Sequence, residues 1–233
     1  MSLPKDVAKM AAKSAVNALP HVILPRLSGT MWRLVDLAID GAGKLPPARS
    51  TAAKHLEKRQ DIDAAIKSVV RVHVGLASAQ AFVTNFGGLI STAIGTPANA
   101  AGIVMVQVRM VACIAHLHGY DIDDPRVRTA MVMCLLGEKE LKQQIKNGSL
   151  PSSPLAVATA PMHDLGLQTK AAERVLNQVL ASSAGKDIAQ FVTRRVPVVG
   201  GGIGAVTDGY GTIQVARCAR NQLINRRVTT HRP

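Results

Sequence analysis

The feature that most constrains the fold is residues 74–108, a stretch that contains no Asp, Glu, Lys, Arg or His. Glycines and polar residues such as Gln80 and Asn85 interrupt it, and it turns back on itself near residues 95–99. Neither arm therefore has the aliphatic density of an ordinary membrane span, which needs about 20 apolar residues. We expect a buried helical hairpin, with shallow membrane insertion and a double span as the alternatives.

The composition favours helices around this hairpin. Hydrophobic residues make up 47% of the 233 residues but aromatic ones only 3%. A core of Ala, Val, Leu, Ile and Met suits closely packed helices better than a β-sandwich. We predict an all-α fold, a single multi-helix domain around a central small-residue hairpin. Its parts are N-terminal basic helices and a connector (1–60), a helical domain (61–228) and a basic tail (229–233).

Local signals place the first helices. Pro20 and Pro25 are expected to bracket a connector, followed by a helix over residues 30–44. Asp61 is a predicted N-cap for a long helix that runs into the uncharged stretch. The return helix that follows Pro97 is apolar nearly all round, so it should lie at the centre of the fold.

The return helix should end at Gly119, which can take the left-handed cap conformation. Asp124 followed by Pro125 is typical of the start of the next helix. The neighbouring His116, His118, Asp121, Asp123 and Asp124 form a His/Asp cluster. Its spacing fits no standard zinc pattern, because positions i and i+2 diverge on a helix. We expect no metal site here and interpret the carboxylates as caps.

The formal net charge of +13 requires an anionic partner or extensive solvation. Nucleic acid is disfavoured, because basic residues do not alternate with aromatic ones and no reading helix stands out. Anionic membrane or lipid fits better, at about 1 kcal/mol per basic residue near the surface. The candidate membrane contacts are the basic residues near both ends, Lys5, Lys9, Lys13, Arg217, Arg220, Arg226 and Arg227.

The three cysteines are widely spaced, which indicates reduced thiols in a cytosolic protein. No secretory signal peptide is recognisable in residues 1–20. The sequence therefore predicts a cytoplasmic protein, with peripheral attachment to the inner face of the cell membrane as an extension of that location.

Arg109 is the charged exception in the apolar return helix. A guanidinium at this place needs an ion-pair partner, a cavity mouth or a lipid headgroup, because an unpaired buried charge is very costly. The candidate lipid-binding or ligand-binding residues are Arg109, Phe82, Phe86 and Met110.

No sequence motif reaches the level of a catalytic site. The segment 198–205 matches GxGxxA, but Pro197 interrupts the strand that a dinucleotide site needs, and no acid follows Asp208. Gly200 and Gly204 would instead let a helix pack closely against another. We expect no cofactor. An enzyme acting on an apolar substrate near Arg109, His116 and His118 is kept as an alternative.

Two motif regions carry a family resemblance. The first is Gly119-Tyr120-Asp121 with Asp124-Pro125 after an apolar helix, and the second is Arg194-Arg195-Val196-Pro197 with the glycines from Gly200 to Gly204. In this order and spacing they resemble the EcsC family over roughly residues 60–225. The resemblance implies a bacterial, cytoplasmic, mostly helical protein without established catalytic residues, whose family is named from a member encoded beside an ABC exporter.

The function predicted from all of this is non-enzymatic membrane association or binding of a lipid or hydrophobic ligand, with the basic ends on anionic membrane. A second possibility that follows from the resemblance is an accessory protein of an ABC-type transporter.

Overall fold

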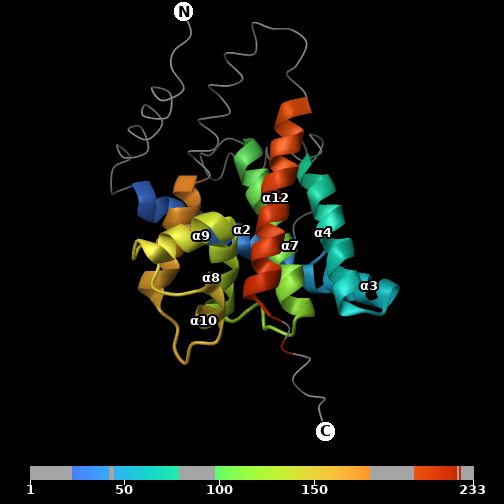
Figure 1. Cartoon of the computed structure of the whole chain (residues 1–233), viewed down its shortest axis with the longest axis horizontal. Helices are drawn as coiled ribbons and strands as arrows, with labels where there is room; N and C mark the ends of the chain where they lie inside the picture. Colours follow the sequence, from blue (N-terminus) through green and yellow to red (C-terminus); the bar gives the residue numbers. More distant parts are fainter. Residues whose placement is uncertain (1–22, 42–44, 79–97, 179–201, 225, 227–233) are drawn as a thin grey trace, which may run out of the picture.

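The computed structural model describes residues 23–41, 45–78, 98–178, 202–224 and 226 (Figure 1). In these ranges the structure contains helices and no strand, so the all-α prediction is confirmed. The helices in chain order are α2 (Ile23–Asp40), α3 (Ala48–Arg59), α4 (Ile62–Ser78), α7 (Ala98–Leu117), α8 (Pro125–Cys134), α9 (Gly137–Lys146), α10 (Pro154–Ala158) and α12 (Gly202–Gln222). Residues 165–178 are also helical.

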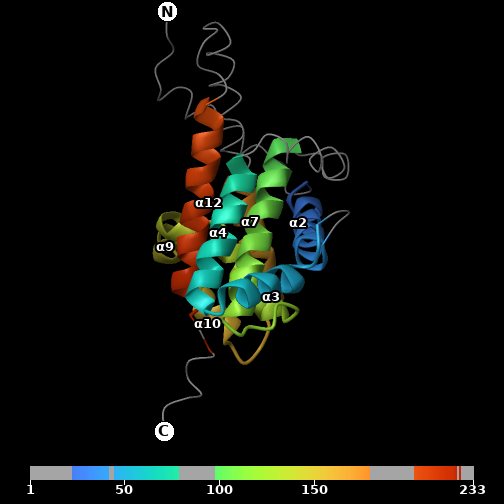
Figure 2. The same cartoon turned by 90° about the vertical axis from the view of Figure 1, so that its right-hand side faces the viewer.

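Helix α7 occupies the centre of the fold. It packs against α2, α3, α4, α8 and α12. Figure 2 shows α12, α4, α7 and α2 side by side, with α3 crossing one end of this layer. From Val104 to Ala115 all but one of the side chains of α7 are buried, and the exception, Gln107, is half-buried. The prediction that the return helix is central is therefore confirmed.

A second group of helices covers the other side of α12 and α7. Helices α8 and α9 pack on each other and on α12, and α10 packs on α8. Helices α2 and α3, which belong to the predicted N-terminal part, contribute Met31, Ile39 and Ala52 to the same core as α7. Most buried hydrophobic side chains of both groups thus form one continuous core, and Ala77 and Val106 form a second, smaller cluster between α4 and α7.

The predicted boundaries of α4 and α8 are confirmed. The carboxylate of Asp61 accepts a hydrogen bond from the Ala64 N–H at 2.7 Å, and α4 begins at the next residue. The carboxylate of Asp124 accepts one from the Arg126 N–H at 2.8 Å, with Pro125 at the first helical position. Both side chains satisfy N–H groups that have no partner inside their own helices.

The prediction for α2 was wrong at both ends. The helix begins at Ile23 and ends at Asp40, whereas the sequence predicted residues 30–44. Pro25 does not lie in a connector but in the first turn of the helix. Proline is tolerated there because the first N–H groups of a helix make no intrahelical hydrogen bond.

Helices α4 and α12 approach closely at a glycine. A Cβ atom added to Gly209 would lie 2.8 Å from the Ser78 Oγ and 3.8 Å from a Val74 methyl carbon. The prediction of close packing by small residues thus applies to α12, but the contact observed is at Gly209. Gly204 lies in the first turn of α12, and Gly200 is outside the described residues.

Helices α4 and α7 are the two arms of the predicted hairpin, and they pack against each other. In the part of the chain that the structure describes, no helix combines the length and the apolarity that crossing a bilayer requires. Residues 79–97, which connect the arms and on which the insertion alternatives depend, lie outside the described residues.

We predict opposite effects for alanine at two glycines. Gly119 has φ +85°, so Gly119→Ala should lower the free energy of unfolding by roughly 1 kcal/mol or more. Gly75 lies exposed within α4, and a Cβ there would meet nothing within 4 Å. Gly75→Ala should therefore stabilise by about 0.5–1 kcal/mol. Urea unfolding of both variants measures this, and a stable Gly119→Ala would contradict the left-handed cap.

Candidate functional site

The structure places Arg109 inside the protein, where three helices meet. Its side chain is on α7 and only 3% exposed. The guanidinium Nη1 donates to the Ala38 carbonyl oxygen of α2 at 3.4 Å, and Nη2 donates to the Thr51 Oγ1 of α3 at 2.6 Å. Arg109 thus connects the end of α2 and the start of α3 to the central helix.

Arg109 lies where the C-terminal end of α2 has carbonyl groups without a hydrogen-bond partner in the helix. The last carbonyl groups of a helix have no partner within it, and they carry the negative end of the helix dipole. The Arg109 guanidinium satisfies the Ala38 carbonyl and places a positive charge at that end. Among the described residues it pairs with no carboxylate. Burial accordingly lowers the pKa of Arg109, while nearby Cys113 raises it.

Burial lowers the pKa values of two histidines on α3 and α4, His55 and His73. His73 is 1% exposed, its Nδ1 donates to the Val69 carbonyl at 2.8 Å, and its Nε2 has no partner among the described residues. Burial lowers the pKa of His73 to about 4, with a contribution from Arg109. His55 hydrogen-bonds to Ser68 Oγ at 3.0 Å, and burial lowers its pKa as well.

The thiol next to Arg109 is not a nucleophile. The Cys113 Sγ donates to the Ala48 carbonyl at 3.4 Å. Burial raises the pKa of Cys113 to about 12, although Arg109 acts in the opposite direction. Because the thiolate is the reactive form, this side chain stays unreactive near neutral pH. The groups around Arg109 therefore serve to join helices.

The other predicted ligand residues do not form a site with Arg109 in the described structure. Met110 is fully buried in the core, and Phe82 and Phe86 lie outside the described residues. His118 is buried at the far end of α7, about 13 Å along the helix from Arg109. Its Nδ1 donates to the Leu223 carbonyl oxygen. Arg109 and His118 therefore do not face a common substrate position.

The turn after α7 is held by the end of α12. The Tyr120 N–H bonds to the Ala115 carbonyl and the Gly119 N–H to the His116 carbonyl, each at 3.0 Å, a pattern typical of a glycine cap. The Arg226 N–H donates to the His118 carbonyl at 2.9 Å. The Arg226 guanidinium lies 5.5 Å from the centroid of the Tyr120 ring, within the range of a cation–π contact.

Of the carboxylates after this turn, Asp124 is a helix cap as predicted, whereas the prediction of caps was wrong for Asp121 and Asp123, which pair with Arg49 of α3. Asp121 Oδ1 accepts from the Asp123 N–H at 3.1 Å, and both carboxylates pair with Arg49 of α3. Asp124 pairs with Arg126, whose hydrogen bonds lower the pKa of Asp124. No group of His, Cys, Asp or Glu among the described residues is arranged to hold a metal ion.

The second motif region and several predicted membrane contacts cannot be placed. Arg194, Arg195, Pro197, Gly200, Lys5, Lys9, Lys13 and Arg227 lie outside the described residues. Arg217 and Arg220 are exposed on α12. Arg226 is also exposed and contacts Tyr120, as described above.

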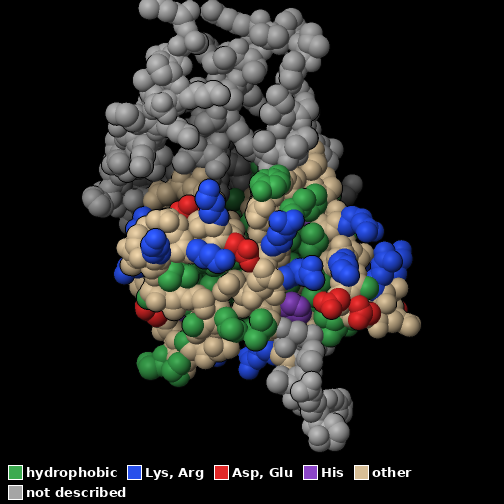
Figure 3. Space-filling view, viewed as in Figure 1, with side chains coloured by type: hydrophobic (Ala, Val, Ile, Leu, Met, Phe, Trp, Pro, Cys, Tyr) green, Lys and Arg blue, Asp and Glu red, His purple; other side chains and the backbone are tan. Residues whose placement is uncertain are grey.

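Two further cations were missed by the sequence reasoning. Lys67 and Arg71 are exposed on α4, the helix that packs against α12. We refer to Lys67, Arg71, Arg217 and Arg220 as the basic surface. Lys and Arg side chains gather over α4 and α12 in Figure 3. The four-residue spacing of Lys67 and Arg71 marks one face of a helix, but which helix lies beside it is a tertiary property.

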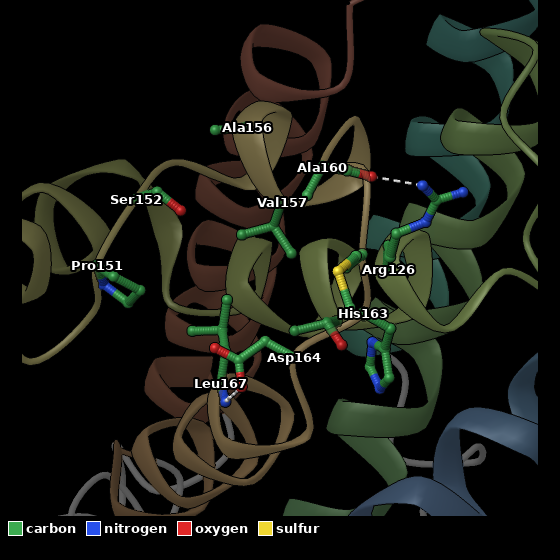
Figure 4. Close-up of a pocket in the computed structure, with 11 residues that line it drawn as sticks. Arg126, Pro151, Ser152, Ala156, Val157, Ala160, His163, Asp164 and Leu167 are labelled. Atoms are coloured by element: carbon green, nitrogen blue, oxygen red, sulfur yellow. Dashed lines mark hydrogen bonds between the residues drawn. The ribbon is translucent and has the colours of Figure 1, made fainter.

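The sequence also gave no signal for a cavity of about 190 Å³ between α8, α10 and the 165–178 helix (Figure 4). Arg126 and Thr129 of α8, Val157 of α10 and Leu167 line it, together with Met162 from the preceding loop. The short helix α10 forms one wall of the cavity. The segments forming this cavity are distant in sequence, so no local pattern predicts it.

Thr51→Val is predicted to expose the structural role of Arg109. The substitution removes the hydroxyl that accepts from Nη2 and leaves a buried N–H without a partner, which should cost about 1–3 kcal/mol of unfolding free energy. In an Arg109→Met background the same substitution should cost much less. A double-mutant cycle by urea unfolding measures the coupling, and additive costs would show that the hydrogen bond contributes nothing.

His73 should make stability fall in mild acid. Its pKa is about 4 in the folded protein and 6.5 when unperturbed, so between these pH values the unfolded chain binds a proton that the folded chain does not. The free energy of unfolding should fall by roughly 3 kcal/mol as the pH drops through this window. Because His55 contributes in the same direction, the measurement is the difference between wild type and His73→Leu. Identical pH profiles would refute the prediction.

No protein-family model, curated protein or solved structure matches this chain. The resemblance to the EcsC family therefore stays a prediction carried by the sequence motifs. What the chain does has to be argued from its own charges, contacts and surfaces.

Proposed function

We propose that this protein attaches peripherally to anionic lipid bilayers as a non-enzymatic, EcsC-type membrane-associated protein. The single observation that carries the proposal is the separation of charge along the helix axes. One end of the central layer consists of uncharged helix segments, and the basic surface begins about two turns below the level at which Ser78 of α4 contacts Gly209 of α12. An anionic bilayer offers the matching order of an apolar interior and a negatively charged headgroup layer.

The uncharged end is formed by three helices. In Figures 1 and 2 the C-terminal end of α4 and the N-terminal ends of α7 and α12 lie at the same end of the molecule. After the buried His73, α4 contains no ionisable residue, and α7 contains none before Arg109. In α12 the single charged residue before Arg217 is Asp208. The described helix segments at this end therefore require little desolvation of charge when they meet an apolar surface.

The basic surface lies at a consistent depth below the contact between Ser78 and Gly209. Gly209 packs against Ser78, which fixes the level of α12 relative to α4. Arg71 is seven residues from Ser78, or about 10 Å, and Arg217 is eight residues from Gly209, or about 12 Å. Long cationic side chains at this depth can extend toward lipid phosphates while their stems stay on the protein. At about 1 kcal/mol per basic residue, four of them supply useful affinity.

Tyr210 lies on α12 between the uncharged N-terminal end of the helix and the basic surface. Its side chain is 63% exposed, and the preceding Gly209 contacts the last turn of α4. Tyrosine combines an apolar ring with a polar hydroxyl, and it is enriched where membranes meet water. An exposed tyrosine at this level supports an orientation with the uncharged end toward the bilayer.

The alternatives receive different support. Docking on a membrane transporter would use the same uncharged end but would not require anionic lipid. An enzyme built on Arg109, His116 and His118 is less well supported, because Arg109 and His118 are committed to separate carbonyl groups. The predicted ligand role of Arg109 is weakened by the same contacts.

Liposome flotation tests the proposal. The protein should float with vesicles that contain phosphatidylglycerol and much less with pure phosphatidylcholine. Replacing Lys67, Arg71, Arg217 and Arg220 together by Gln should remove up to about 4 kcal/mol of attraction, enough to abolish flotation. High salt should weaken binding for the same reason.

The matched control removes four exposed cations elsewhere, Arg33, Lys54, Lys170 and Arg174. This variant has the same net charge as the test variant and should keep most of the binding. Equal losses in the two variants would mean that total charge, not the basic surface, governs attachment. Failure of the wild-type protein to float with either vesicle would eliminate membrane attachment.

A further inference from the structure

The cavity between α8, α10 and the 165–178 helix lies apart from the basic surface, which is on α4 and α12. Its apolar lining includes Val157 and Leu167, whose side chains point toward one another in Figure 4. Met162, also in the lining, is 80% exposed, which is unusual for a large apolar side chain. The cavity thus offers buried apolar walls and an exposed apolar rim.

The basic and hydroxyl side chains of α8 at the cavity already have protein partners. Arg126 pairs with Asp124 and donates to the Ala160 carbonyl, so its guanidinium points away from Val157 in Figure 4. Thr129 Oγ1 donates to the Pro125 carbonyl at 2.8 Å. Neither side chain needs a charged ligand in the cavity to satisfy it.

The two polar residues from the loop after α10 are also engaged. His163 hydrogen-bonds through Nε2 to Gln168 at 2.8 Å, and Asp164 accepts from the Leu167 N–H at 3.1 Å. The Ser152 hydroxyl, also in the lining, is the exception, since it has no hydrogen bond to any described residue. The cavity therefore leaves one hydroxyl for a ligand, and its carboxylate, Asp164, is exposed to water and caps the 165–178 helix.

The cavity volume limits the size of the ligand. Its volume of about 190 Å³ is somewhat larger than the roughly 150 Å³ of an engineered apolar cavity that binds benzene. A group of six to eight heavy atoms is therefore of suitable size. A charged head would have to leave water, and that cost opposes binding.

We propose that this cavity binds a small uncharged ligand with a compact apolar body and at most one hydroxyl group. Val157, Leu167 and Met162 contact the apolar body, and Ser152 is the hydrogen-bonding partner of the hydroxyl. This site does not depend on membrane attachment, because no residue of the basic surface lines it.

Three six-carbon probes that differ only in their head groups test the proposal: hexan-1-ol, hexanoate and hexylammonium. The measurement is methyl NMR of the full-length protein, following the Val157 and Leu167 methyl signals during titration. Hexan-1-ol should give saturable shifts, with a Kd at least about tenfold lower than those of the two charged probes. Absence of saturable shifts with hexan-1-ol would overturn the proposal, and so would equal binding of all three probes.

Two substitutions at the cavity, compared with one control elsewhere, test where hexan-1-ol binds. Ala156 is exposed and lines the cavity, so Ala156→Phe should fill the space and abolish hexan-1-ol binding. Ala53→Phe, at an exposed position of α3, is the matched control and should bind normally. Met162→Ser tests the rim without adding volume and should weaken binding severalfold. Unchanged affinity in either cavity variant would overturn the proposal.

Discussion

The burial of α7 is the constraint on which the rest of this structure depends. A helix that packs on five neighbours can carry few charges, because each buried charge needs compensation. The sequence meets this demand with apolar residues on all faces and one arginine. Arg109 is tolerated because it meets a carbonyl at the end of α2 and a hydroxyl at the start of α3. A single guanidinium thereby adds polar contacts with both α2 and α3 to their apolar packing on the central helix.

Small residues set the second constraint, which is the distance between helices. Gly209 lets α12 approach α4 until the backbone of one helix meets a serine side chain of the other. Close approach compensates for the shortage of aromatic residues, since many small contacts replace a few large ones. It also brings two exposed cationic faces onto neighbouring helices, and the basic surface is a consequence of this packing.

The parts of the fold that could be predicted from the sequence are those decided within a few residues. Asp61, Asp124 and Gly119 cap helices through contacts at most five residues away, so their residue types predict their roles. The start of α2 was missed because proline suits a first helical turn as well as a connector.

The partners in the candidate sites could not be predicted in the same way. Arg109 was recognised as an anomaly, but its carbonyl partner lies 71 positions away in the sequence. The pairing of α4 with α12 joins residues more than 130 positions apart, so the basic surface has no local signature. The cavity likewise combines three segments whose proximity depends on the packing of α10 against α8.

The two ends of the molecule differ in the ion pairs and hydrogen bonds that join their helices. Around the turn after α7, ion pairs and hydrogen bonds join α3, α8 and the residues after α12. Toward the uncharged end, the described residues pack mainly through apolar side chains, and Gln107 Nε2 of α7 donates to Thr212 Oγ1 of α12 at 3.3 Å. Apolar contacts are less directional than hydrogen bonds, so this end can adjust its packing at lower cost. The end that we propose to face a bilayer is thus also the end whose helices can adapt to it while the opposite end keeps the fold together.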